Sequence, residues 1–177
     1  MGMALPLRKF ALTAHVISSV GWLGAVAGFL VLAVVGLTSR DDQTVRSVYL
    51  MLDLMAWYVI LPLCFASVLT GLVSSLSTTW GLFRHYWVLL KIVITIPSSL
   101  MLLVHMQPIG YIAGIAAQTP SSIADLQSLK IQLVIEASAA LLVLLVATAL
   151  SVYKPKGRTR YGWRKQQRAL VQPSELP

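Results

Sequence analysis

Three long stretches of this chain contain no charged residue, and each is long enough to cross a lipid bilayer. They cover residues 10–39, 54–83 and 92–124, whereas about 20 apolar residues suffice for a transmembrane helix. A fourth stretch, 137–153, reaches that length if it begins near Ile131 and includes Glu136. Because hydrocarbon offers the backbone no hydrogen-bond partner, such stretches fold as helices. The sequence therefore predicts an all-α, polytopic membrane protein built as a four-transmembrane-helix bundle.

The composition excludes a soluble domain, since 57% of the residues are hydrophobic, 11% are charged and the mean hydropathy is +0.78. We place helices at about 10–38, 48–77, 85–107 and 126–153, in one domain, 1–153, that a basic tail, 154–177, follows. The first apolar stretch exceeds the roughly 7–15 residues of a signal peptide, so we expect it to be kept as a helix. The single cysteine, Cys64, excludes an intrachain disulfide and a CxxC redox motif.

Basic residues are distributed unequally across the predicted membrane. Ten of the fourteen lysines and arginines fall on one side, namely Arg8, Lys9, Arg84 and the seven of the tail, Lys154, Lys156, Arg158, Arg160, Arg164, Lys165 and Arg168. The positive-inside rule then predicts that both termini are cytoplasmic and that the number of helices is even. Charge alone would allow the tail to bind nucleic acid, but next to a membrane span we expect it to set the topology and contact anionic lipids, with no nucleic-acid partner.

The connections and packing faces can also be predicted. Gly24 and Gly28 form a small-xxx-small motif that favours close approach of another helix. The second helix carries a stripe of small or polar residues with a bend expected at Pro62, and the longest connection is predicted at 107–125. The stripe consists of Asp53, Trp57, Cys64, Ser67, Gly71 and Thr78.

The third helix concentrates polar residues in an otherwise apolar chain. Arg84, Lys91, Ser98 and His105 recur at intervals of seven, which places them on one nearly straight stripe of an α-helix. A lysine inside a membrane helix is expensive in hydrocarbon, so it faces the bundle interior, a partner or a cofactor. We therefore expect the functional site on this stripe.

A haem site is one interpretation of the residues level with Lys91. His15 lies six residues beyond Lys9 and Lys91 seven beyond Arg84, so both lie roughly 10 Å into the membrane. A neutral imidazole can bind haem iron, and on the same helix face Ser19 leaves room beside it and Trp22 can pack on the macrocycle. Arg8 and Arg84 are placed for the propionates. The other interpretation of His15 is a structural histidine bonded to a serine or a backbone carbonyl.

A second polar layer lies nearer the outer boundary. Asp53, His105 and Glu136 are each predicted one or two turns from it. They can form a hydrogen-bonded plug that fixes helix register, or a proton or metal site, for which copper is the alternative cofactor.

The chain resembles a short, largely uncharacterised bacterial family of four-helix integral-membrane proteins over nearly its whole length, including residues 80–87, Trp-Gly-Leu-Phe-Arg-His-Tyr-Trp. In the pattern of His15, Trp22 and Gly24, with Trp87 and Lys91, it also resembles the membrane domain of copper resistance protein D and the HemJ-type protoporphyrinogen oxidase, a haem b protein. The latter resemblance implies that His15 is the haem ligand and that Lys91 is essential. The bacterial family implies an inner-membrane location.

Three functions follow from these interpretations. The first is a haem b protein with a redox or electron-transfer role, which would need a quinone or a redox protein as partner and would include a haem-dependent oxidoreductase. The second is a copper or other metal-ion permease that uses His105, Asp53 and Glu136. The third is a non-catalytic scaffold subunit, and the oligomeric state stays open for all three.

Overall fold

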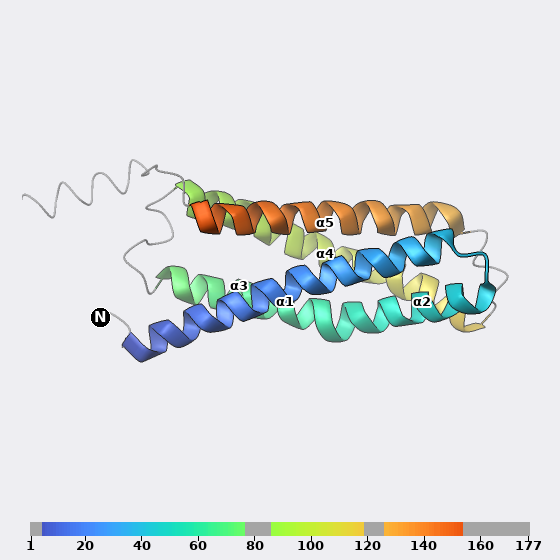
Figure 1. Ribbon diagram of the computed structural model, residues 1–177, viewed down its shortest axis with the longest axis horizontal. Coiled ribbons are helices and arrows are strands. Elements are labelled where there is room, and N and C mark those ends of the chain that lie inside the picture. Colours follow the sequence, from blue (N-terminus) through green and yellow to red (C-terminus); the bar gives the residue numbers. More distant parts are fainter. Residues whose placement is uncertain (1–4, 77–85, 119–125, 154–177) are drawn as a thin grey trace, which may run out of the picture.

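A computed structural model of the protein describes residues 5–76, 86–118 and 126–153, and Figure 1 shows that these form long helices. The helices are α1 (Leu5–Thr38), α2 (Asp42–Met55), the π-helical turn η1 (Ala56–Ile60), α3 (Leu61–Leu76), α4 (Tyr86–Gln118) and α5 (Gln127–Tyr153). Because α2, η1 and α3 form one continuous span, the described residues contain four helical spans long and apolar enough to cross a membrane. The predicted all-α, multi-pass membrane fold is confirmed.

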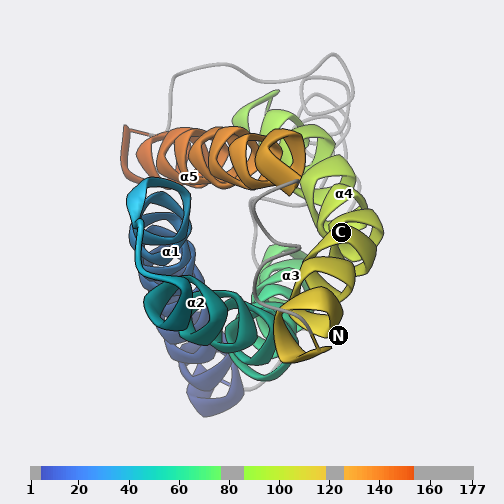
Figure 2. The same cartoon turned by 90° about the vertical axis from the view of Figure 1, so that its right-hand side faces the viewer.

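The spans run antiparallel and surround a common axis, as Figure 2 shows. We call the end of the bundle at which α1 begins and α5 ends the terminal end. The opposite end, at which α1 ends and α2 begins, is the loop end. α1 packs on α3, α5 and α2, and α4 packs on α2 and α5, whereas α3 barely meets α4. Towards the terminal end the bundle therefore divides into two pairs, α1 with α3 and α4 with α5 (Figure 1).

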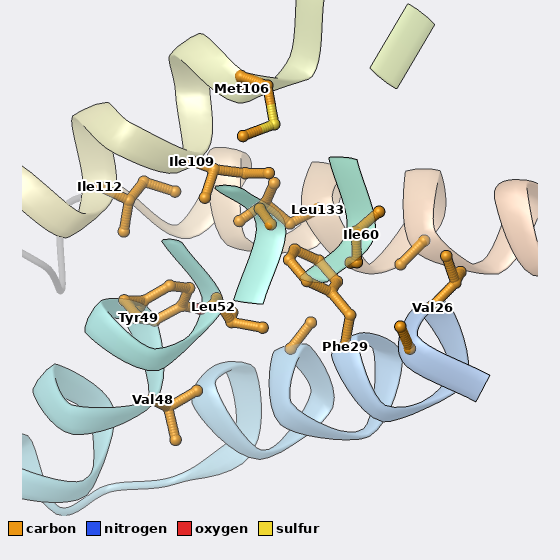
Figure 3. Packing of buried hydrophobic residues seen from close by; sticks show 14 of the residues in the cluster. Val26, Phe29, Val48, Tyr49, Leu52, Ile60, Met106, Ile109, Ile112 and Leu133 are labelled. Atoms are coloured by element: carbon orange, nitrogen blue, oxygen red, sulfur yellow. The ribbon is translucent and has the colours of Figure 1, made fainter. Parts of the chain in front are cut away.

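The apolar core lies towards the loop end. There Tyr49 and Leu52 of α2 pack against α4 and α5, as Figure 3 shows. The buried side chains of α4 begin at Met106 and continue with Ile109, Ile112, Ala113 and Ala116. Of the α4 side chains that the structure describes from Tyr86 to His105, none is buried. Among the described residues, α4 thus contributes buried side chains to the loop half of the bundle alone.

The third predicted helix is longer than expected. α4 continues to Gln118, so the prediction that residues 107–118 belong to a long connection is wrong. Pro108 lies inside the helix, where a membrane helix tolerates the lost hydrogen bond because neighbouring helices support the backbone. Burial of Ile109 and Ile112 stabilises the extension, and the Arg46 guanidinium donates a 3.1 Å hydrogen bond to the carbonyl of Ala117 near its end.

The π turn changes the predicted face of the second span. The amide of Leu61 bonds to the carbonyl of Ala56, five residues earlier, so this turn holds one residue more than an α-helical turn. Residues on its two sides are consequently out of phase by about 100° relative to a regular helix. Cys64 and Ser67 are buried as expected, but Trp57 is 50% exposed, so its predicted inward position is wrong.

The glycines that allow close approach are not those of the predicted motif. A Cβ on Gly24 would have no neighbour within 4 Å among the described residues, and one on Gly28 would meet only the methyl group of Met55, at 3.2 Å. At Gly36, by contrast, a Cβ would lie 3.0 Å from both Tyr49 and Val48. Close contact between α1 and α2 thus depends on a glycine outside the small-xxx-small motif.

Candidate cofactor site

His15 of α1 is fixed by the facing helix, α3. Its Nδ1 lies 3.0 Å from the backbone carbonyl oxygen of Ser67. A carbonyl can only accept, so Nδ1 carries the hydrogen and the lone pair of the neutral ring lies on Nε2. Metal-binding histidines are commonly oriented in this way, with one nitrogen donating to a backbone carbonyl and the other left for the metal. Within the described residues, Nε2 has no hydrogen-bond partner.

Hydroxyl groups from both helices surround Nδ1 of His15. Ser19 and Thr70 place their oxygens 3.5 Å and 3.4 Å from Nδ1, and Ser19 is 2.8 Å from the hydroxyl of Ser67. Ser18 is buried and donates to the carbonyl of Ala14 at 2.8 Å. The cluster ties α1 to α3 and holds the imidazole at one orientation, which satisfies both interpretations of His15 given by the sequence.

Gly71 provides the space that the imidazole fills. A Cβ at this position would lie 2.9 Å from Cε1 of His15 and 3.2 Å from its Nδ1. Real Cβ atoms do not approach so closely, so any larger residue would displace the ring. The sequence placed Gly71 on an inward stripe without indicating which side chain it accommodates.

Lys91 belongs to the other helix pair. Its ammonium donates a 2.6 Å hydrogen bond to the hydroxyl of Ser151 on α5. Lys91 and His105, both on the predicted stripe, make their side-chain contacts with α5, so the stripe marks the α4–α5 interface.

The other residues predicted to contact the cofactor, Trp22, Arg8 and Arg84, do not share one environment. Trp22 is 4% exposed within the apolar cluster, and its Nε1 is buried without a hydrogen-bond partner among the described residues. Arg8 is exposed in α1 towards the terminal end. Arg84 lies outside the described residues.

The second polar layer is only partly assembled. His105 Nε2 lies 2.5 Å from Oε1 of Glu136, and its Nδ1 lies 2.6 Å from the carbonyl of Met101. Gln132 donates to the same Glu136 oxygen at 2.6 Å. Asp53 instead lies near Gly110, where a Cβ would be 3.8 Å from its Oδ1.

These contacts limit what the layer can bind. Among the described residues no three His, Cys, Asp or Glu side chains are grouped so that they could share a metal ion, so Asp53 does not complete a ligand set with His105 and Glu136. Both ring nitrogens of His105 are also engaged. The layer lies deeper than predicted, because the extension of α4 puts His105 thirteen residues before Gln118, where the helix ends.

Two functional partners could not be identified from the sequence. The Ser67 carbonyl is a backbone group, and no side-chain pattern reveals which carbonyl a distant histidine reaches. Ser151 is a single hydroxyl at the end of a long aliphatic stretch, and it becomes recognisable only once α4 and α5 are placed side by side.

Comparison of the chain with protein-family models, with curated proteins and with solved structures finds no match.

Proposed function

We propose that the protein is a membrane haem b protein with a redox or electron-transfer role, in which His15 Nε2 is the axial ligand. One observation carries this proposal: the 3.0 Å bond from Nδ1 to the Ser67 carbonyl fixes the tautomer that leaves Nε2 free. Haem would supply reversible one-electron chemistry that the side chains of this chain lack.

The terminal half of the bundle supports the proposal. The two helix pairs diverge there, and no described side chain of α4 from Tyr86 to His105 is buried, unlike those of α4 in the loop half. His15 lies on one pair and Lys91 on the other. A flat apolar group held between the pairs would contact α4 side chains that are not buried among the described residues.

The remaining residues have defined roles in this proposal. Ser19 and Ser67 orient the ligand, and Trp22 offers an unpartnered N–H and an apolar ring. Arg8 and Arg84 would neutralise the propionates, and Lys91 is either the second ligand or a charge that tunes the iron. Electrons would be exchanged with a quinone or a redox protein; the copper alternative is less favoured because both nitrogens of His105 are engaged.

The spectrum of the purified protein tests this function. Protein expressed with ample haem should show a Soret band and reducible α and β bands. Lys91→Met should keep most of the haem and shift the spectrum or the midpoint potential, because a charge or a ligand near the iron is lost. Ser151→Ala is the matched control, since it removes the partner of Lys91 and keeps the charge. A colourless protein that carries stoichiometric copper lost in His105→Ala would contradict the proposal.

We propose further that both termini face the cytoplasm of a bacterial inner membrane, which puts the candidate haem site in the cytoplasmic half. Reporter fusions after Arg40 and after Tyr153 should then give opposite results, with Arg40 external, because ten of the fourteen basic residues lie on the side of the termini. A reporter at Arg40 that is found in the cytoplasm would show that the protein has the opposite orientation in the membrane.

A further inference from the structure

The His105–Glu136 pair lies deep within the spans. Glu136 is nine residues from the start of α5, and His105 is thirteen residues from the end of α4. At about 1.5 Å per residue these positions are roughly 14 Å and 20 Å from the loop-side ends of their helices. Ionisable groups at such depth are costly and generally serve a function.

The geometry of the pair determines how many protons it holds. His105 Nδ1 faces the Met101 carbonyl at 2.6 Å, so this nitrogen carries a hydrogen. Nε2 and Glu136 Oε1 are 2.5 Å apart, a distance at which two lone pairs would repel, so one further proton lies between them. The pair therefore consists of a carboxylate, a neutral imidazole and one shared proton, and its net charge is zero.

The pair leaves one acceptor unused. Oε2 of Glu136 is buried and has no hydrogen-bond partner among the described residues, whereas Oε1 accepts from both His105 and Gln132. A buried oxygen without a donor costs free energy. A pair that only fixed helix register would be expected to satisfy both oxygens, as a fully paired network does.

Few other charges face the pair. α2 contributes Asp53, whose Oδ1 is also buried and unpartnered among the described residues, and α5 contributes Lys130, whose ammonium lies 5.9 Å from the centre of the Tyr49 ring. α1 has no titratable residue from 16 to 38, and α3 has only Cys64. Among the described residues, Arg46 of α2 donates to the Ala117 carbonyl and Lys91 of α4 donates to Ser151, so neither cation pairs with Glu136 Oε2.

We propose that the His105–Glu136 pair is a proton-binding site in the middle of the bundle. A proton that arrives at Glu136 Oε2 converts the carboxylate into the neutral acid, while the shared proton stays on His105 Nε2 and the pair gains one positive charge. Release of one proton restores the neutral pair, and no electron moves. The proton reaches the pair from the terminal half, because five α4 side chains beyond the pair are buried in the core, namely Met106, Ile109, Ile112, Ala113 and Ala116, whereas no described α4 side chain from Tyr86 to His105 is buried.

Nitrogen NMR of the full-length protein in lipid bilayers, labelled with ¹⁵N-histidine, tests this proposal. The chain has three histidines, so His105→Gln identifies the signals of the pair. Nδ1 should stay protonated at every pH, and Nε2 should move towards the imidazolium position as the pH falls. Glu136→Gln should remove this titration, and Asp53→Asn should leave it in place. A His105 signal that does not change with pH, or that titrates equally in Glu136→Gln, would overturn the proposal.

A second measurement needs no variant. Hydrophobic carbodiimides modify protonated carboxyl groups in apolar surroundings, so Glu136 of the wild-type protein should be modified increasingly as the pH falls, which peptide mass spectrometry would locate. Absence of modification at Glu136 at any pH would overturn the proposal. Neither measurement depends on haem, so a protein without haem that passes both would contradict the proposed function and retain the proton site.

Discussion

His15→Ala abolishes haem retention, which is the largest effect that we expect from any single substitution. Iron would lose the imidazole of His15, whose Nδ1 is held by a backbone carbonyl and whose Nε2 has no hydrogen-bond partner among the described residues. The Soret absorbance per mole of purified protein measures the loss. The fold should survive, because the neighbouring bond between Ser19 and Ser67 also joins α1 and α3.

Two controls separate ligation from folding. His105→Ala should keep the haem spectrum, since this residue contacts α5 in another part of the bundle. Free imidazole added to His15→Ala should restore part of the haem, because the vacated space has the shape of the ring. A His15→Ala protein that keeps its full Soret band would exclude His15 as the ligand.

Gly71→Ala should weaken haem binding without weakening the fold. The added Cβ would lie 2.9 Å from Cε1 of His15, so the ring must turn and its Nδ1 must move away from the Ser67 carbonyl. We expect roughly tenfold weaker retention, which corresponds to about 1.4 kcal/mol. Alanine is also the better helix former by roughly 0.5–1 kcal/mol, so thermal stability should not fall in parallel.

Gly24→Ala is the matched control for this substitution. It makes the same chemical change in α1, but the added Cβ meets no described atom within 4 Å. It should leave haem content unchanged and show only the effect of helix propensity. Equal haem loss in both variants would mean that the space beside His15 is not what Gly71 provides.

The features predicted correctly from the sequence are those that hydrophobicity determines directly. Four spans follow from the lengths of the apolar stretches. The helical period also predicted a common face for His15, Ser19 and Trp22; Ser19 lies 3.5 Å from Nδ1 of His15, and Trp22 is buried. These predictions depend on repetition along one helix, which a single sequence contains.

The features that were missed depend on neighbouring helices. Pro108 and Gly110 are typical of a loop, yet burial of Ile109 and Ile112 against α2 keeps them helical. The sequence left open whether the stripe from Lys91 to His105 faces the bundle interior, a partner or a cofactor, and it did not identify α5 as the helix that Lys91 and His105 contact. The acceptor of His15 is a backbone carbonyl, which has no sequence signal.

The π turn at Ala56–Ile60 also constrains how this sequence can vary in length. The residues before the turn face α4 in one helical phase, and those after it, including Ser67 and Gly71, face His15 in another. Deleting one residue from the turn would restore a regular α-helix and rotate the two halves against each other by about 100°. We therefore expect that residues can be inserted or deleted in the connections between spans but not at this turn. A substitution in the turn preserves the relative rotation of α2 and α3, whereas a deletion destroys it.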